Sequence, residues 1–264
     1  MIKHMKLLEE QIKILSSNII VSCSNRKGLR KATGKLLESY FFKLTSLASP
    51  DLTIEVGAHE ARFSRYVSNN LKKSRCIAFE ANPHVFDKYK NILLPMNIEY
   101  LNTAISQKSG KISFSIPLTL NDKSLKKDNA ISSIHKRNHD GFTYKTVNVD
   151  SKQLDSFTFQ NHQHIILWID VEGAQYDVLA SAGKLWSNID AVYIEVEKKR
   201  VWENQILDYE IREYLISLGF VEIMRDNLAI YQYNSVYLKK NLIKNIEVQE
   251  LIRDYCSELI KLLD

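Results

Sequence analysis

The sequence lacks most features that mark secreted, disulfide-stabilised or membrane-spanning proteins. Its three cysteines, Cys23, Cys76 and Cys256, are far apart and form no Cys-x-x-Cys or Cys/His ligand spacing. We therefore expect reduced thiols in a cytoplasmic protein. No apolar run reaches the roughly 18 residues needed to span a bilayer. The acidic start of the chain also lacks the apolar stretch of a secretory signal, so we expect neither a leader nor a membrane span.

The charge of the chain is only mildly positive. The formal net charge is +5, and charged residues make up 25% of the chain. A basic cluster in residues 26–35 has few interleaved aromatic residues, and no nucleic-acid motif accompanies it. These features favour a solvated helix face and no nucleic-acid partner. The apolar content of 45% is sufficient for a packed core, and 264 residues fit one domain with appendages.

Three zones can be distinguished along the chain. Residues 1–50 have apolar positions at helical spacing and predict an N-terminal helical extension. Residues 51–235 form the predicted main domain, and residues 236–264 have the pattern of an amphipathic C-terminal helix. The terminal helices either cover the core or pair two copies of the chain in a homodimer, and the sequence leaves both options open.

Strand and helix patterns alternate within residues 51–235. This alternation predicts an α/β, Rossmann-like fold, with a mainly parallel sheet between helices. A hairpin signal, Phe220–Met224 and Leu228–Tyr233 around Arg225-Asp226-Asn227, predicts an antiparallel ending. The pair Lys111–Pro117 and Tyr144–Val149 is also predicted to be antiparallel, around a long polar loop. The other predicted strands are Leu52–Val56, Cys76–Phe79, Ile98–Ile105, Ile165–Ile169 and Ala191–Val196, and the predicted helices are Phe63–Leu71, His84–Leu94, Ala174–Leu185 and Tyr209–Leu218.

The loop after the first predicted strand is the candidate ligand loop, because parallel α/β sheets bind ligands beyond the carboxyl ends of their strands. Gly57 leaves space for close approach of a ligand to the backbone. Glu55 is placed to accept a hydrogen bond from an ammonium group, whereas a pyrophosphate would be repelled there. Glu80 ends the second strand at about the offset expected for a carboxylate on ribose hydroxyls. The pattern favours a nucleoside that carries a positive amine.

These segments resemble the FkbM family of S-adenosylmethionine-dependent methyltransferases. The resemblance covers roughly residues 52–233, and the family's usual Asn, Gly and Pro are replaced here by His59, Ala61 and Ala81. It implies a class I methyltransferase sheet, S-adenosyl-L-methionine as cofactor, and methylation of a hydroxyl on a sugar, glycan or secondary metabolite. The matching segments are IEVGAHEARFS (54–64), AFEANPHVF (78–86), NTAIS (102–106), SSI (132–134) and WIDVEGAQYDVL (168–179).

Together with the strand-end argument, the resemblance predicts the cofactor-binding residues. They are expected on the loops that follow the predicted strands. The set comprises Glu55, Gly57, Ala58, His59, Glu80, Ala81, Asn102, Ala104, Ser132 and Asp170.

Methylation of an alcohol requires a group that takes up the hydroxyl proton, or a metal on the hydroxyl. Asp170 is the first candidate for base or metal ligand and Glu172 the second, although both residue types also stabilise helix starts. His135 is a third candidate because histidine titrates near neutral pH. Glu195 would complete a carboxylate cluster suited to magnesium. A divalent metal is therefore an option, but none is predicted.

Two other functions remain open at this point. A nicotinamide-dependent oxidoreductase shares the acid after the second strand, but His59 and Ala61 occupy glycine positions of the GxGxxG loop. A non-catalytic, cofactor-binding scaffold protein is suggested by Ala61 and by the helical extensions.

Overall fold

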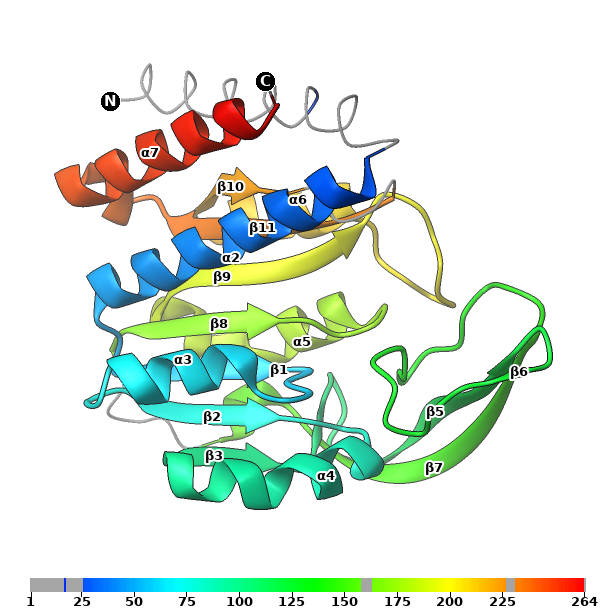
Figure 1. Cartoon of the computed structure of the whole chain (residues 1–264). Coiled ribbons are helices and arrows are strands. Elements are labelled where there is room, and N and C mark those ends of the chain that lie inside the picture. Colours follow the sequence, from blue (N-terminus) through cyan, green and yellow to red (C-terminus); the bar gives the residue numbers. More distant parts are fainter. Residues whose placement is uncertain (1–16, 18–25, 158–162, 227–230, 264) are drawn as a thin grey trace. The chain divides into compact units, whose positions relative to one another are not determined.

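The computed structural model (Figure 1) describes residue 17 and residues 26–157, 163–226 and 231–263. The chain forms two compact units. One takes its residues from 1–49, 190–199 and 207–264, and the other from 50–189 and 200–206. The borders predicted at residues 50 and 235 remain predictions. Among the described residues, no helix is both long and apolar enough to cross a membrane.

The second unit is built on a parallel sheet in the order β8-β1-β2-β3. Its strands are β1 (Leu52–Val56), β2 (Arg75–Phe79), β3 (Ile98–Leu101) and β8 (Ile165–Ile169). Every residue of β1 and β8 is buried, as their continuous apolar runs require of strands covered on both faces. Helices α3 (Arg62–Asn70) and α4 (Pro83–Leu93) follow β1 and β2, and the short η1 (Leu94–Met96) precedes β3. The predicted Rossmann-like α/β class is confirmed.

A second sheet in the same unit has the order β4-β7-β5-β6. Its strands are β4 (Ala104–Ile105), β5 (Gly110–Leu120), β6 (Lys123–Ser124) and β7 (Phe142–Lys152). The antiparallel pairing predicted for the two long segments is confirmed. The single strand predicted for Ile98–Ile105 is wrong, because the chain leaves the first sheet after Leu101 and Ala104–Ile105 pairs with β7.

The helix predicted for Ala174–Leu185 is shorter in the structure. It consists of α5 (Gln175–Ser181) followed by the separate 3₁₀ turn η3 (Gly183–Ser187). Gly183 has φ +43°, and a side chain there would lie 2.1 Å from the Asp155 carboxylate on η2 (Leu154–Ser156). A glycine in this conformation ends α-helices commonly, and it separates the two elements here.

The first unit contains the antiparallel order β10-β11-β9. Its strands are β9 (Ile189–Glu197), β10 (Phe220–Arg225) and β11 (Gln232–Lys239), and α6 (Asp208–Ser217) precedes β10. The antiparallel C-terminal hairpin is confirmed. The strand predicted for Leu228–Tyr233 is wrong in position, because Arg225 pairs with Ser235 and β11 starts only at Gln232. The predicted turn falls partly on residues 227–230, which lie outside the described residues.

Helices α2 (Lys27–Ala48) and α7 (Ile246–Leu263) of the first unit pack against each other, with the rings of Tyr40 and Tyr255 5.5 Å apart. The C-terminal helix starts later than the predicted residue 236, because β11 extends to Lys239 and η4 (Leu242–Lys244) follows it. The helical pattern of residues 1–16 lies outside the described residues. A homodimer through the terminal helices remains a prediction.

The loop after β1 passes very close to the loop after β8. Asp170 N donates to Val56 O at 2.9 Å, and Gly57 N donates to Phe79 O at 3.0 Å. Gly57 has φ +78°, and a Cβ built on it would lie 1.9 Å from the backbone oxygen of Asp170. Glycine is required here by the crossing of two backbones and by the left-handed conformation. The expectation that it is needed for ligand approach is therefore incomplete.

We expect Gly57→Ala to destabilise the protein by about 3 kcal/mol or more, because the added methyl group meets backbone atoms that have no alternative position. Urea unfolding followed by circular dichroism measures this loss. The matched control is Gly28→Ala in α2, where a Cβ meets nothing within 4 Å. That substitution should stabilise by up to about 0.5 kcal/mol. Equal stability of the two variants would contradict the crossing argument.

Candidate functional site

The register of the parallel sheet brings three loops to one level. Val56 is paired with Phe79 on one side and with Ile169 on the other. The residues that follow these three strand ends therefore lie together at the carboxyl edge of the sheet. They are Gly57 after β1, Glu80 after β2 and Asp170 after β8. In Figure 1 the hairpin of β5 and β7 lies on the side toward which the arrowheads of β1, β2 and β8 point. This edge is where a doubly wound fold binds its ligand.

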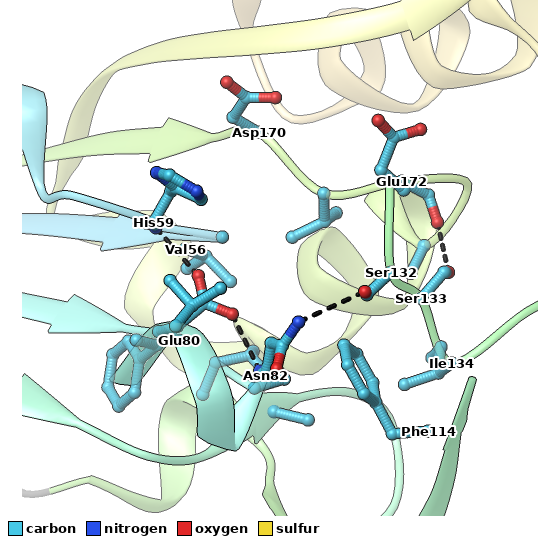
Figure 2. Close-up of a pocket in the computed structure, with 18 of the residues that line it drawn as sticks. Val56, His59, Glu80, Asn82, Phe114, Ser132, Ser133, Ile134, Asp170 and Glu172 are labelled. Carbon is cyan, nitrogen blue, oxygen red and sulfur yellow. Dashed lines mark hydrogen bonds between the residues drawn. The ribbon is translucent and has the colours of Figure 1, made fainter. Parts of the chain in front are cut away.

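A cavity of about 740 Å³, continuous with solvent, lies at this edge (Figure 2). The strand-end loops, the start of α4 and one face of the second sheet supply its walls. Eight of the predicted site residues line it, namely Gly57, His59, Glu80, Ala81, Ala104, Ser132, Asp170 and Glu172.

Glu80 is held by backbone groups on the cavity wall. Its Oε2 accepts from His59 N at 2.8 Å and its Oε1 accepts from Asn82 N at 2.7 Å (Figure 2). Each carboxylate oxygen has a second lone pair, so Glu80 can still accept hydrogen bonds from a ligand. Burial raises the pKa of Glu80 to about 7, although these two N–H groups favour the ionised form.

Glu55 does not line the cavity, which corrects its predicted role. Its carboxylate accepts from the backbone N–H groups of Phe63 at 3.2 Å and Ser64 at 2.8 Å, in the first turn of α3. Successive side chains of a strand point to opposite faces, and Val56 is the neighbour that faces the cavity. Glu55 therefore fixes the start of α3, where an acid also complements the helix dipole. Burial raises its pKa to about 7.

The segment between Gly57 and α3 contains two residues in the left-handed region, His59 at φ +46° and Ala61 at φ +55°. The Tyr100 hydroxyl donates to His59 O at 2.6 Å and fixes the turn below the His59 side chain, which lines the cavity. Ala61 is fully buried directly before α3 and is not a lining residue. Ala58 is also buried and not a lining residue, and its N–H donates to Phe79 O at 2.9 Å.

Asp170 and Glu172 are both cavity residues, but their surroundings differ. Asp170 is exposed to the cavity, and burial of its carboxyl among protein atoms raises its pKa to about 6. Solvent in the open cavity moderates this effect. The carboxylate of Glu172 lies 3.3 Å from Nη2 of Arg137, and its backbone oxygen accepts from the Ser133 hydroxyl. A carboxylate paired with an arginine is the weaker base, so Asp170 is the better proton acceptor.

His135 is not a cavity residue, contrary to its predicted role as a base. Its Nε2 lies 3.1 Å from Oδ2 of Asp177 on α5. Burial favours the protonated form of Asp177, but hydrogen bonds from His135 and Gln107 lower its pKa overall. The imidazole is therefore engaged in a hydrogen-bonded pair outside the cavity. The exposed His139 is not a lining residue either.

Asparagine side chains organise the wall opposite Asp170, and sequence reasoning missed two of them. Asn82 accepts from His84 N at 3.0 Å as the cap of α4, and its Nδ2 lies 3.2 Å from Ser132 Oγ (Figure 2). Asn129 Oδ1 accepts from the Ser132 hydroxyl at 3.0 Å. The Asn-Pro pair before α4 gave a visible helix-start signal, whereas nothing in the pattern pointed to Asn129.

Asn102 supports this wall from behind and is not a lining residue. Its Nδ2 donates to the backbone oxygens of Glu80 at 2.8 Å and Ala81 at 3.3 Å. Most of the apolar part of the wall was missed because α4, β4, β5 and the loop between β6 and β7 supply it together, and no local pattern shows that these segments meet. It consists of Val85, Ile105, Phe114, Ala130 and Ile134, together with the predicted Ala104.

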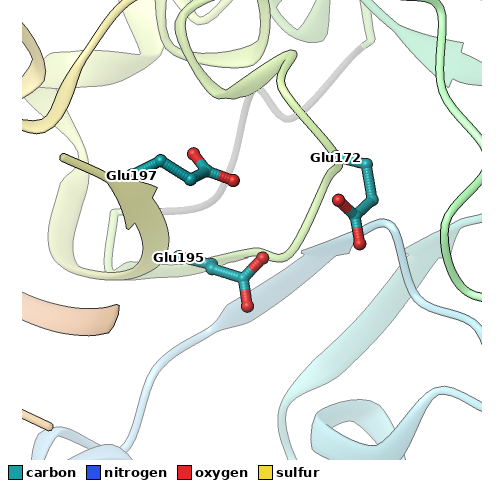
Figure 3. Close-up of side chains that lie close together, drawn as sticks. All are labelled: Glu172, Glu195 and Glu197. Carbon is teal, nitrogen blue, oxygen red and sulfur yellow. The ribbon is translucent and has the colours of Figure 1, made fainter. Parts of the chain in front are cut away.

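Glu195, the candidate for a magnesium cluster, lies on β9 in the first unit. It projects from the same face of that strand as Glu197, as residues two apart must (Figure 3). Gln232 on β11 donates to Glu195 at 2.7 Å. A metal role for Glu195 remains an untested option.

The charged residues that line the cavity are all acidic. Its described lining residues include three carboxylates, Glu80, Asp170 and Glu172, and no lysine or arginine. Such a lining attracts a cation and repels a phosphate or pyrophosphate. Arg137 neutralises Glu172 from outside the lining, so Glu80 and Asp170 dominate the charge that a ligand meets.

Comparison with known proteins gives one family. The family described as the methyltransferase FkbM domain matches residues 55–222. Over 222 residues, the chain is 22% identical to the 2-O-methyltransferase NoeI of Sinorhizobium fredii (strain NBRC 101917 / NGR234), covering 78% of this chain and 90% of that protein.

Likeness to solved structures is low. The methyltransferase FkbM from Methylobacillus flagellatus KT has a TM-score of 0.45 at 10% identity, and the match covers 72% of this chain but only 44% of that longer chain. The 1,6-didemethyltoxoflavin-N1-methyltransferase of Burkholderia thailandensis, with bound S-adenosylhomocysteine, has a TM-score of 0.41 at 9% identity, covering 88% of this chain and 90% of that one. Scores this low do not bear on function.

We expect the free energy of unfolding to fall as pH rises from about 4.5 to about 7. Glu55, Glu80 and Asp170 have raised pKa values in the folded state, so the folded protein keeps protons that the unfolded chain releases in this interval. Urea unfolding at pH 5, 6, 7 and 8 measures the slope. Asp170→Asn should make the fall shallower, and stability that rises over this interval would contradict the argument.

Proposed function

Because this chain belongs to the FkbM methyltransferase family, we propose that it transfers a methyl group from S-adenosyl-L-methionine to a hydroxyl of a sugar, glycan or other small metabolite. The methyltransferase activity follows from the family, whose match covers residues 55–222. The cofactor and the hydroxyl acceptor are the proposed parts. They are supported by the chemistry of the cavity and by the likeness to a 2-O-methyltransferase.

The observation that carries the proposal is the anionic lining without a basic side chain among its described residues. S-adenosylmethionine carries a sulfonium and an ammonium group, and it has no phosphate. A nicotinamide dinucleotide carries a pyrophosphate, which Asp170 would repel, whereas an acid at the position of Glu80 suits the ribose of either cofactor. The same lining therefore disfavours the oxidoreductase hypothesis.

The two ends of the cavity fit the two parts of this cofactor. The apolar wall that includes Phe114 and Ile134 suits a flat purine ring, and Glu80, on the other side of Asn82 (Figure 2), suits the two ribose hydroxyls. Asp170 lies at the opposite, acidic end and suits the ammonium or the sulfonium. Asp170 replaces Glu55 as the proposed acid for the ammonium group, because Glu55 binds the first turn of α3.

When bound, S-adenosylmethionine supplies a methyl group on a positively charged sulfur. Asp170 has a pKa raised to about 6, so it is mostly ionised at pH 7 and still basic enough to accept a proton. The Asp170 carboxylate would take up the proton that the acceptor hydroxyl loses when its oxygen is methylated. Glu80 holds the nucleoside, and the packed loops fix the alignment of the reactants.

Calorimetry with S-adenosylmethionine and S-adenosylhomocysteine tests the cofactor directly. Binding of both, with NADH showing none, is the expected result. Folded protein that binds neither at high micromolar concentration would overturn the proposal. Retained binding with no transfer to a broad hydroxyl panel would favour the scaffold hypothesis instead.

We expect Glu80→Ala to weaken S-adenosylhomocysteine binding by about 1–3 kcal/mol, the scale of hydrogen bonds to a charged group. Calorimetry at pH 8, where Glu80 is mostly ionised, measures the change. The control is Glu99→Ala, which removes an exposed carboxylate on β3 that pairs with Arg75 at 2.6 Å. The control should bind like the parent protein, and an unaltered dissociation constant for Glu80→Ala would refute the ribose role.

We expect Asp170→Asn to lower methyl transfer at saturating cofactor by roughly 100-fold or more, because the amide cannot accept the hydroxyl proton. Cofactor affinity should fall by a smaller factor, because the attraction to the positive charge of the cofactor is lost. Transfer is measured with S-adenosylmethionine labelled in its methyl group, on acceptors found in a screen of sugars and glycans. Glu172→Gln should lose less, since Arg137 already engages that carboxylate. Full activity of Asp170→Asn would remove this residue from the chemistry.

A further inference from the structure

The hairpin of β5 and β7 has one packed face and one open face. Side chains alternate along a strand, so Val147 and Val149 of β7 share the face that packs with the cavity residue Phe114. Phe142, Tyr144 and the residues at every second position after them share the other face. On that open face, Phe142 and Tyr144 are half-buried, while Thr146 and Asn148 are exposed.

The two aromatic side chains of the open face, Phe142 and Tyr144, are here called the aromatic strip. Their ring centroids are 5.9 Å apart, and the ring planes differ by 29°. The Tyr144 hydroxyl accepts from Arg137 N at 3.3 Å, and the Arg137 guanidinium lies 5.8 Å from the Phe142 ring centroid. These contacts hold both rings in nearly parallel planes without covering them completely.

The aromatic strip is tied to the rim of the cavity by Arg137. This guanidinium stacks 4.4 Å from the ring centroid of the buried Trp202, and its Nη2 lies 3.3 Å from the carboxylate of the cavity residue Glu172. The backbone is fixed as well, since Asn138 N donates to Val201 O at 2.8 Å. Arg137 therefore lies between the aromatic strip and the cavity residue Glu172.

We propose that the aromatic strip binds a neutral sugar ring of the acceptor, next to the sugar that is methylated. The inference rests on the proposed function. A pyranose ring presents C–H groups on its faces and hydroxyls at its edge, so its face packs on an aromatic ring and its edge needs polar partners. Thr146 and Asn148 continue the same open face beyond Tyr144 and supply such partners.

The charge of the open face selects a sugar over a nucleic acid. Aromatic side chains also stack on nucleobases, but nucleic-acid sites need unpaired cations along the phosphate path. On this face Lys111 pairs with Asp150 at 2.8 Å, and Arg137 at its end is paired with Glu172. The exposed Lys123 and Lys152 are at opposite ends of the hairpin, and Lys152 lies 5.1 Å from the Phe157 ring centroid, so they form no continuous row of cations. The neighbouring Thr146 and Asn148 are uncharged. The occupant is therefore a neutral glycan.

The test uses the full chain saturated with S-adenosylhomocysteine on a printed array of neutral oligosaccharides, followed by calorimetry with the bound glycan. Phe142→Ala and Tyr144→Ala should each weaken glycan binding by about tenfold, with cofactor affinity unchanged. Tyr144→Phe keeps the ring and should retain most of the affinity. The control is Lys145→Ala, which alters an exposed residue on the opposite face of β7.

Three results would overturn the proposal, namely no glycan bound on the array, equal glycan affinity of Phe142→Ala and the parent protein, or loss of poly(U) RNA binding in the strip variants. Failure of the proposed function gives a different result, because the protein then fails to bind S-adenosylhomocysteine. The glycan array without cofactor still tests the strip in that case. Thermal unfolding of each variant separates lost contacts from lost folding.

Discussion

The site depends on the crossing of two backbones at the carboxyl edge of the parallel sheet. The register of β8, β1 and β2 ends these strands at one level, and Gly57 permits the loop after β1 to touch the backbone oxygen of Asp170. Without this approach Glu80 and Asp170 would not face one cavity. A constraint of backbone packing thus determines how far apart these two carboxyl groups lie.

The same crossing gathers three carboxyl groups at the strand ends, with Glu55 and Glu80 buried and Asp170 open to the cavity. Glu55, Glu80 and Asp170 all have pKa values raised by burial, so each is less stable in its ionised form than it would be in water. A bound cation offsets this cost for Glu80 and Asp170, which line the cavity, but not for Glu55, which binds the start of α3. The lining therefore favours a positively charged ligand over an anionic one.

Sequence patterns predicted the parallel strands well, because runs such as Ile165–Ile169 are apolar on both faces and have clear ends. They failed where pairing decides the structure. Nothing local shows that the chain changes sheets at Asn102, or that Arg225 pairs with Ser235 across a longer connection. In the site, residues next to strand ends were found by position, whereas Asn129 and Phe114 depend on how the second sheet folds over the cavity.

The contrast between Glu55 and Glu80 shows what a strand-end argument needs besides spacing. Both are acids near the ends of neighbouring strands, yet Glu55 lies within β1, one residue before Val56, and Glu80 lies one residue beyond Phe79. Within the strand, alternation turns Glu55 away from Val56 and the cavity, toward the first turn of α3. Beyond the strand, alternation no longer applies, and the N–H groups of His59 and Asn82 orient Glu80 instead. The face of the strand therefore decides which acid meets a ligand, and distance along the sequence does not.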